Sequence, residues 1–266
     1  MDDTAQTDVA VERIGTTAWI RFNRPHVRNA ARVRTAQELC AALDEAEADP
    51  AVRAIVIAGI GNHFMAGADL GFLQEVGMLE PAEVRTVVYS HFQGAARRLF
   101  HCAKPTIAAV RGAALTVGCE WAICCDFRVA TPSALFQEKW IRAAALPPLG
   151  GLKLLPQLIG LGAAKAMVLR GQAIDGEEAL RIGLVNELVE NERLDEVAGD
   201  LADELARLSP HAYLAAKQGL HRGLDSPMDH EWQANVTAQA MLIGSAHFKR
   251  GVEAIRAGGI EDFSRS

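Results

Sequence analysis

Glu120 is the residue of this 266-residue chain that is best placed for acid–base chemistry. It stands in the apolar stretch VGCEWAICC, directly after the small-residue segment RGAALT. Apolar surroundings disfavour the charged form of a carboxyl group, so its pKa rises toward neutrality and the group can both donate and accept a proton. The alternative is an acidic side chain that only complements the dipole at the start of a helix.

Two segments share one design, in which a buried strand is followed by small residues and then by a helix. The first is RAIVIAG followed by FMAGADL, and the second is TIAAVRGAALTVGCE. Small residues let a ligand approach the backbone closely, and the first N–H groups of a helix have no intrahelical acceptor. Two such N–H groups that converge on one carbonyl oxygen would form an oxyanion hole. Tight packing of glycine-containing loops is the alternative interpretation.

A second group of polar side chains lies in FQEKWI, residues 136–141. In an extended segment Glu138 and Trp140 would share a face, so Glu138 could point inward. We expect it instead to stay at the rim, paired with Lys139 or Arg142. Trp140 is expected to bring an indole N–H donor or an aromatic wall.

The elements that would position these residues alternate between short apolar strands and amphipathic helices up to about residue 192. Strands are predicted in VAVERI, TAWIRFN, RAIVIAG, KPTIAAVRG, DFRVA, ALF and LVNELV. After residue 192 the pattern is helical only. Leu194, Val197, Leu201, Leu205 and Leu208 recur at helical spacing. The sequence therefore predicts an α/β core over 1–192 and a helical annex over 193–266, which we expect to cover the site and to form a trimer.

The composition is that of a globular protein, with 50% hydrophobic and 23% charged residues and a net charge of -6. This charge gives no support for nucleic-acid or membrane binding. The five cysteines form no CxxC pair, the N-terminus does not resemble a signal peptide, and no uncharged apolar run reaches about 18 residues. The histidines lack metal-ligand spacing. We expect a cytoplasmic protein with reduced core thiols and no metal; a nucleophilic Cys119 is a less favoured alternative.

Several motifs in order resemble the crotonase superfamily, the enoyl-CoA hydratase/isomerase group. They are NRPHVRNA, FMAGADL, KPTIAAVRGAALTVGCEWAICCDFRVA, LPPLGG, RIGLVNELV and SPHAYLAAKQGL, and the match covers roughly residues 9 to 263. The resemblance implies an α/β fold built as a spiral of ββα repeats with a C-terminal helical domain. It also implies an acyl-CoA substrate, with CoA as part of the substrate and no further cofactor.

The resemblance assigns roles to individual residues. Two backbone N–H groups, those of Ala66 and Val117, would hold the thioester oxygen, and Glu120 would be the acid/base residue. Val117 stands where relatives have glycine, which predicts a narrower pocket. Arg28 would contact a CoA phosphate. The remaining residues expected to bind substrate are Ala30, Ala68, Asp69 and Leu70, where Asp69 can also cap a loop or helix.

One position departs from the pattern of the hydratases. Their second catalytic glutamate falls on Trp140 in this chain, and Glu138 takes the position of a glutamine. An enzyme of hydratase/isomerase type with Glu120 as the only retained glutamate is therefore expected, with inward-pointing Glu138 as the alternative second carboxylate. A catalytically weak acyl-CoA binding protein and a C–C bond hydrolase are alternatives from other classes. Dehalogenation is disfavoured because Pro148 occupies the place of the required aspartate.

Other polar residues are weaker candidates. His63 and His91 could reach the pocket, but a surface or core histidine is the more common case. The last helix offers Lys249, Arg250 and Arg256 to CoA, in place of the pair that relatives carry. The apolar stripe of the predicted helix after residue 192, together with the resemblance, predicts a homotrimer or a hexamer made of two trimers.

Overall fold

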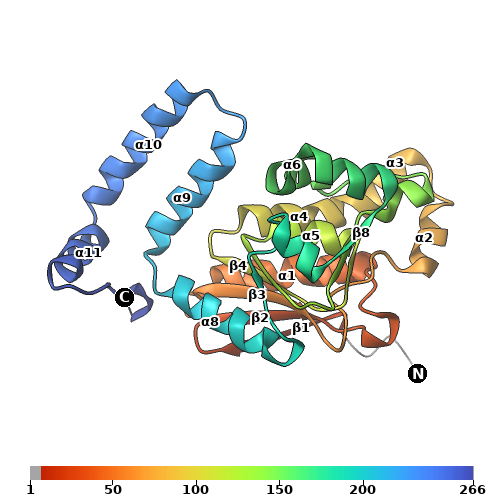
Figure 1. Cartoon of the computed structure of the whole chain (residues 1–266), viewed down its shortest axis with the longest axis horizontal. Coiled ribbons are helices and arrows are strands. Elements are labelled where there is room, and N and C mark those ends of the chain that lie inside the picture. Colours follow the sequence, from red (N-terminus) through yellow and green to blue (C-terminus); the bar gives the residue numbers. More distant parts are fainter. Residues whose placement is uncertain (1–6, 266) are drawn as a thin grey trace.

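The computed structural model describes residues 7–265 and has an α/β core from which three C-terminal helices project (Figure 1). The main sheet has the order β1-β2-β3-β4-β6-β9, and every neighbouring pair except β1–β2 is parallel. A smaller sheet has the order β5-β7-β8. The strands are β1 Val9–Ile14, β2 Thr17–Phe22, β3 Ala54–Gly59, β4 Thr106–Val110, β5 Ala113–Leu115, β6 Phe127–Ala130, β7 Leu135–Gln137, β8 Ala173–Asp175 and β9 Glu187–Leu188.

Helices cover both faces of the main sheet, which explains the nearly continuous apolar sequences of β3 and β4. The core helices are α1 Val33–Ala48, α2 Leu70–Val76, α3 Pro81–Glu83, α4 Ser90–His101, α5 Val117–Cys124, α6 Gly151–Arg170, α7 Gly176–Arg181 and α8 Leu194–Ala206. A π-helical turn, η2 Val84–Tyr89, joins α3 to α4, and 3-10 turns occur at η1 Pro25–Val27, η3 Lys139–Ala143, η4 Asn191–Arg193 and η5 Phe263–Arg265. These elements confirm the α/β fold class.

The helix α8 corrects the predicted domain boundary. Its buried residues Leu194, Val197 and Leu205 pack on Trp19, Val56 and other residues of the main sheet. The stripe that suggested a subunit interface is therefore covered by the same chain, and only Leu208, just beyond the helix, is substantially exposed. The core thus extends to about residue 206.

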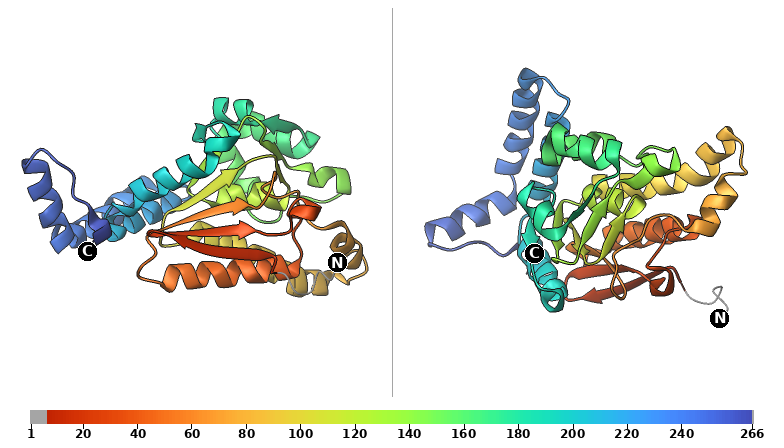
Figure 2. Two further views of the ribbon diagram at one scale, coloured as in Figure 1. Left: turned by 90° about the horizontal axis from the view of Figure 1, so that it is seen from below. Right: turned by 45° about the vertical axis from the view of Figure 1, so that its right-hand side comes forward.

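The projecting annex consists of α9 Pro210–Gly223, α10 Met228–Ile243 and α11 Ala246–Arg256. Figures 1 and 2 show α10 and α11 on the side of the molecule away from α2. Helices α10 and α11 therefore do not cover α2, contrary to the expectation, whereas α9 lines a pocket together with Ile123 and Cys124 of α5. Its exposed apolar side chains include Trp232, Val236, Met241 and Ile255.

Helix α6 is divided at Gly160, because this glycine has the non-helical angles φ 75° and ψ 156°. Among the described residues, α6 is the one helix whose length and composition would allow it to cross a membrane. The break at Gly160 interrupts that span.

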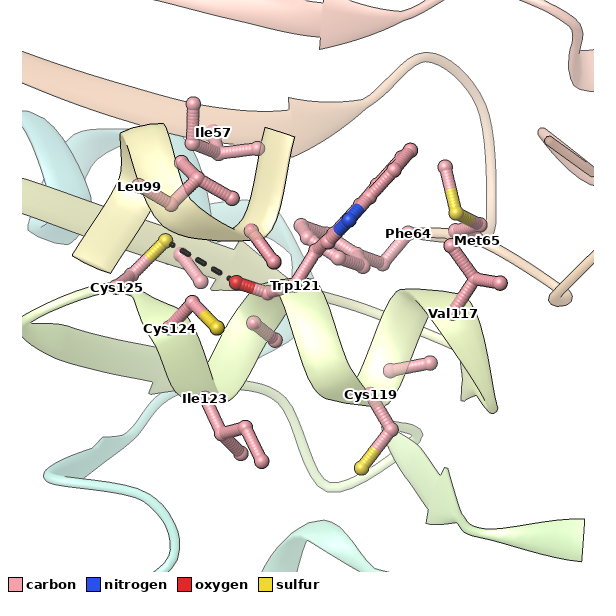
Figure 3. Close-up of a cluster of buried hydrophobic side chains, with 14 of the residues drawn as sticks. Ile57, Phe64, Met65, Leu99, Val117, Cys119, Trp121, Ile123, Cys124 and Cys125 are labelled. Carbon is pink, nitrogen blue, oxygen red and sulfur yellow. Dashed lines mark hydrogen bonds between the residues drawn. The ribbon is translucent and has the colours of Figure 1, made fainter. Parts of the chain in front are cut away.

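The core around α5 is formed by large apolar side chains and by thiols (Figure 3). Cys119, Cys124 and Cys125 are buried there, and Cys125 Sγ lies 3.6 Å from the carbonyl oxygen of Trp121. All five cysteines are free. Burial raises the pKa of the Cys119 thiol, with the nearby Glu138 adding to the effect, so Cys119 is not a reactive thiolate.

Candidate active site

Helix α5 holds Glu120 in the interior, and all eight residues of this helix are buried. Thr116 precedes it with φ 48° and ψ -108°, a sharp change of direction that starts the helix directly after β5. The Glu120 side chain has no exposed surface. The short helix thus places a carboxyl group inside the protein, one turn from an N-terminus with unpaired N–H groups.

One oxygen of Glu120 is held by the turn before α6, and the other is not. Oε2 accepts hydrogen bonds from the backbone N–H groups of Leu149, at 2.7 Å, and Gly151, at 2.9 Å. Oε1 is buried and has no hydrogen-bond partner among the described residues. Burial raises the pKa of Glu120 to about 7, against the lowering effect of these backbone N–H groups. The predicted rise in pKa is confirmed, and Oε1 is the oxygen available to a proton.

The two small-residue loops lie against each other at the positions of Gly67 and Gly118. A Cβ atom on Gly67 would lie 2.3 Å from Thr116 Oγ1, and one on Gly118 would lie 2.7 Å from the Met65 carbonyl oxygen. Such contacts leave no room for any side chain, so glycine is required at both positions. Figure 3 shows Val117 beside Met65. The expected convergence of the two loops is present.

The structure contradicts the prediction that Ala66 is the first oxyanion donor. The Ala66 N–H already donates to the Arg28 carbonyl oxygen at 3.0 Å. Ala31 forms a parallel bridge with this loop. Its N–H donates to the Gly67 carbonyl oxygen at 2.8 Å, and its carbonyl oxygen accepts from the Asp69 N–H at 2.8 Å. In such a bridge the N–H of the residue between the two partners, here Ala68, points away from Ala31. Ala68 lines the cavity described below, and its N–H has no acceptor within residues 7–265. Ala68, which we expected only to bind substrate, therefore has the free N–H group that the predicted donor Ala66 lacks.

Val117, the expected second donor, also has a free backbone N–H group. It is the first residue of α5, and its backbone N–H has no acceptor in the described part of the chain. Its side chain is buried and lines the same cavity as Ala68. The free N–H groups of Ala68 and Val117 are thus brought to one place by loops in direct contact.

Glu138 lies in the interior and not at the rim. Gln137 ends strand β7, and the chain then turns into the 3-10 helix η3, so the extended geometry assumed for FQEKWI is lost after one residue. Glu138 has no exposed surface, and its carboxyl oxygens have no hydrogen bond of normal geometry in the described structure, although Cys119 and Trp140 are close enough to lower its pKa. The expected pair with Lys139 or Arg142 is wrong. Burial, followed by the charge of Glu120, raises the pKa of Glu138 well above its usual range.

Trp140 lies next to both carboxyl groups and also lines the cavity. Its ring packs against the core and lines the cavity, while its indole Nε1 is buried without a hydrogen bond of normal geometry among the described residues. The indole N–H is nevertheless close enough to lower the pKa of both Glu120 and Glu138, against the larger effect of burial. Trp140 thus offers both features expected of it, an N–H donor and an aromatic wall.

A small cavity of about 30 Å³ opens at this point. It is lined by Ala68, Phe72, Leu73, Val76, Val88, Tyr89, Phe92, Val117, Trp140, Pro148 and Leu149. Its volume accommodates a water molecule or two, in agreement with the narrow pocket predicted from Val117. Burial and the charge of Glu120 raise the pKa of Tyr89, which places this tyrosine near Glu120. Tyr89 was missed from the sequence because it stands in the π-helical turn, an irregularity that no motif predicts.

The remaining candidates occupy several environments. Asp69 caps α2 by accepting from Gly71 N at 2.9 Å and pairs with Arg24 at 3.0 Å, so its expected capping role is confirmed. Leu70 is 78% exposed and Ala30 is buried. Arg28 is exposed and has a left-handed backbone, with φ 54°.

Neither candidate histidine lies on the cavity. His63 Nδ1 accepts from Ala113 N at 3.1 Å, while His91 Nε2 lies 3.3 Å from Gln37 Nε2. Arg28 lies near His63, since burial and then the charge of this arginine lower the histidine's pKa. No cluster of His, Cys, Asp or Glu suited to a metal ion occurs between residues 7 and 265.

A sequence model described as enoyl-CoA hydratase/isomerase matches residues 12–257. The chain belongs to the enoyl-CoA hydratase/isomerase family. It is 36% identical over 223 residues to a short-chain-enoyl-CoA hydratase of Clostridium acetobutylicum, covering 84% of each chain. It is 32% identical over 251 residues to a crotonyl-CoA hydratase of Syntrophomonas wolfei, covering 94% of this chain and 95% of the relative.

Solved structures of the family agree with this assignment. A crystal structure described as a putative enoyl-CoA hydratase from Streptomyces coelicolor superposes with a TM-score of 0.91 at 29% identity. The comparison covers 98% of this chain and 96% of that one. The crotonase fold expected from the motifs is thereby confirmed over nearly the whole chain.

Proposed function

We propose that this family member adds water to an enoyl-CoA thioester, with Glu120 as the acid/base residue. One observation carries the proposal: the free N–H groups of Ala68 and Val117 lie on abutting loops at a cavity beside Glu120, whose Oε1 is unpaired. Two N–H donors stabilise the negative charge that develops on a thioester oxygen, and an unpaired carboxylate oxygen beside them can accept a proton. The hydratase names of the two relatives described above support the same reaction.

The chemistry follows from this arrangement. Glu120 takes a proton from water as the water oxygen bonds to Cβ of the enoyl group, and the electron pair of the double bond moves onto the thioester oxygen. The N–H groups of Ala68 and Val117 hold that oxygen as an enolate. Cα then takes this proton back from the protonated Glu120 as the electron pair of the enolate returns to Cα, which completes the hydration and restores the Glu120 carboxylate. Glu138, whose pKa burial raises well above its usual range, is a second carboxyl group in the same interior, and its presence supports hydration over a single-base double-bond shift.

The nucleotide part of CoA is proposed to bind at Arg28. This side chain is exposed near the loop that carries Ala68, and the Arg28 carbonyl oxygen is held by the Ala66 N–H. The backbone bond fixes the point from which the guanidinium reaches toward a phosphate.

A homotrimer, or a hexamer of two trimers, is also proposed. Its support is the annex, because Trp232, Val236 and Met241 on α10 are each more than 60% exposed within a single chain. Large apolar side chains gathered on a projecting helix are typical of a surface that another chain covers. Light scattering that shows a monomer across micromolar concentrations would reject this assembly.

Purified protein mixed with crotonyl-CoA should remove the absorbance of the conjugated enoyl thioester and release a 3-hydroxyacyl-CoA identified by mass spectrometry. Glu120→Gln is the control, since it keeps the shape of the side chain and removes the titrating group. A protein that binds crotonyl-CoA and its longer and aryl homologues but turns none of them over would be an acyl-CoA binding protein, the main alternative. Turnover of a cyclic diketone without CoA would favour the C–C bond hydrolase.

A further inference from the structure

The lining of the cavity is unusually aromatic for this chain. Phe72, Tyr89, Phe92 and Trp140 are four of its eleven lining residues, whereas aromatic residues make up 6% of the sequence. None of the eleven carries a charge. The part of the acyl group that enters here must therefore be apolar, and it meets rings on several sides.

These rings belong to an ordered stack that continues into the core. Phe72 and Phe92 are stacked with centroids 5.6 Å apart and planes 9° apart. Phe92 stacks in turn on Trp121, at 5.8 Å and 23°. Phe72 is the outer end of this series and is only partly buried. A stack that ends at a cavity presents a ring to whatever enters, and a parallel, offset ring is a favourable neighbour for it.

The wall beside Phe72 is thin. Phe72, Val76 and Val88 line the small cavity and also an outer groove of about 430 Å³. An apolar cavity has to reach roughly 150 Å³ to hold benzene, so the inner space of about 30 Å³ alone is too small for a ring. Two of the three wall residues come from α2, a seven-residue helix with no buried residue. A substrate ring therefore fits only if this helix shifts so that the two spaces join.

We propose that the acyl group of the substrate carries an aromatic ring near Cβ, which lies among Phe72, Tyr89 and Trp140. The inference rests on the proposed function, because it places Cβ beside Glu120 and the thioester at Ala68 and Val117. The ring then points from the reacting carbon toward the outer groove. Aliphatic chains also fit an apolar space, but stacked aromatic walls favour a flat ring over a puckered one of equal size.

The test separates recognition of the ring from turnover. Calorimetry compares 3-phenylpropanoyl-CoA with 3-cyclohexylpropanoyl-CoA, which are saturated, unreactive and of similar size. Binding of the phenyl thioester should be tighter by about 3- to 10-fold, the range expected for one aromatic pair. Phe72→Leu should reduce this ratio to near one. Phe248→Leu, in α11 and outside the cavity lining, should leave the ratio unchanged.

The outcomes distinguish this inference from the proposed function. Equal binding of the two thioesters by a protein that hydrates crotonyl-CoA would overturn the aromatic inference and leave the function intact. Preferential binding of the phenyl thioester without hydration of crotonyl-CoA or 3-phenylacryloyl-CoA would support the inference and overturn the function. A preference that persists in Phe72→Leu would also overturn the inference, because the stack would not be its source.

Discussion

The interior holds two groups of buried acidic side chains that are organised in opposite ways. Asp126, two residues after the end of α5 and with its side chain 10% exposed, is surrounded by partners. Its Oδ2 accepts from Thr106 N at 2.9 Å, from Tyr213 at 3.1 Å and from Lys217 Nζ at 2.8 Å. Glu120, inside α5, has one satisfied oxygen, and neighbouring Glu138 has no hydrogen bond of normal geometry among the described residues.

The difference shows what each group does. Burying a charge is costly unless it is paired, so Asp126 and Lys217 stabilise the attachment of α9 to the core only as a pair. Buried oxygens without partners cost free energy in the resting protein, and they are usually explained by a ligand or a reaction. We therefore interpret the Asp126 group as an anchor and the Glu120–Glu138 group as the reactive site. The following predictions test that division.

The largest expected effect is the loss of turnover in Glu120→Gln. The amide keeps the shape and can still accept from the Leu149 and Gly151 N–H groups, but it cannot take a proton from water. The value of kcat for enoyl-CoA hydration should fall by about 10²- to 10⁴-fold with little change in substrate binding. Stopped-flow or steady-state absorbance measures it. A near-normal kcat would exclude Glu120 as the acid/base residue and point to Glu138.

Breaking the anchor should instead lower stability. Asp126→Asn leaves the buried ammonium of Lys217 without its counter-charge, which typically costs about 3–5 kcal/mol of unfolding free energy. Chemical denaturation measures the loss. The double variant Asp126→Asn/Lys217→Met removes both charges and should recover part of it. An unchanged free energy of unfolding in Asp126→Asn would show that the Asp126 group is not an anchor, and that the two groups do not differ in the way proposed.

The same Glu120→Gln variant should be more stable than the wild type at high pH. Glu120 has a pKa of about 7 when folded, against 4.5 for an unperturbed glutamate, so the folded state binds the proton more tightly. This contribution to stability is fully present below about pH 4.5 and is lost as the pH rises through 7. The loss amounts to about 3 kcal/mol at most. Urea denaturation at pH 5 and pH 8 should show the gap between variant and wild type widening; a constant gap would contradict the raised pKa.

These residues also show how far the sequence could lead. Glu120 was predictable because its apolar neighbours and its place at a helix start are both local. The choice between Ala66 and Ala68 was not, since it depends on a bridge to Ala31, a segment far away in the sequence. Glu138 was placed at the rim because an extended strand was assumed, and the turn into η3 reverses that direction.

The fold shows the same limit. The strands and the break of α6 at Gly160 follow from apolar runs and from glycine, which act locally. The role of α8 does not, because its stripe has the same spacing whether it packs on its own sheet or on another subunit. Helical periodicity indicates that one face of a helix is buried, but it does not identify the surface that covers that face.

The smallest predicted effect is expected at Arg28, outside both buried groups. A phosphate contact at an exposed guanidinium is screened by solvent, so it contributes less than the buried carboxyls do. Calorimetry should show an acyl-CoA binding more tightly than the matching pantetheine thioester. Arg28→Ala should narrow that difference by about 1–2 kcal/mol and leave the pantetheine affinity unchanged. Arg13→Ala, an exposed arginine near the β1–β2 turn at the other end of the hairpin, is the matched control. If Arg13→Ala narrows the difference in affinity as much as Arg28→Ala does, Arg28 contributes only to the general surface charge, and the CoA phosphates are bound elsewhere.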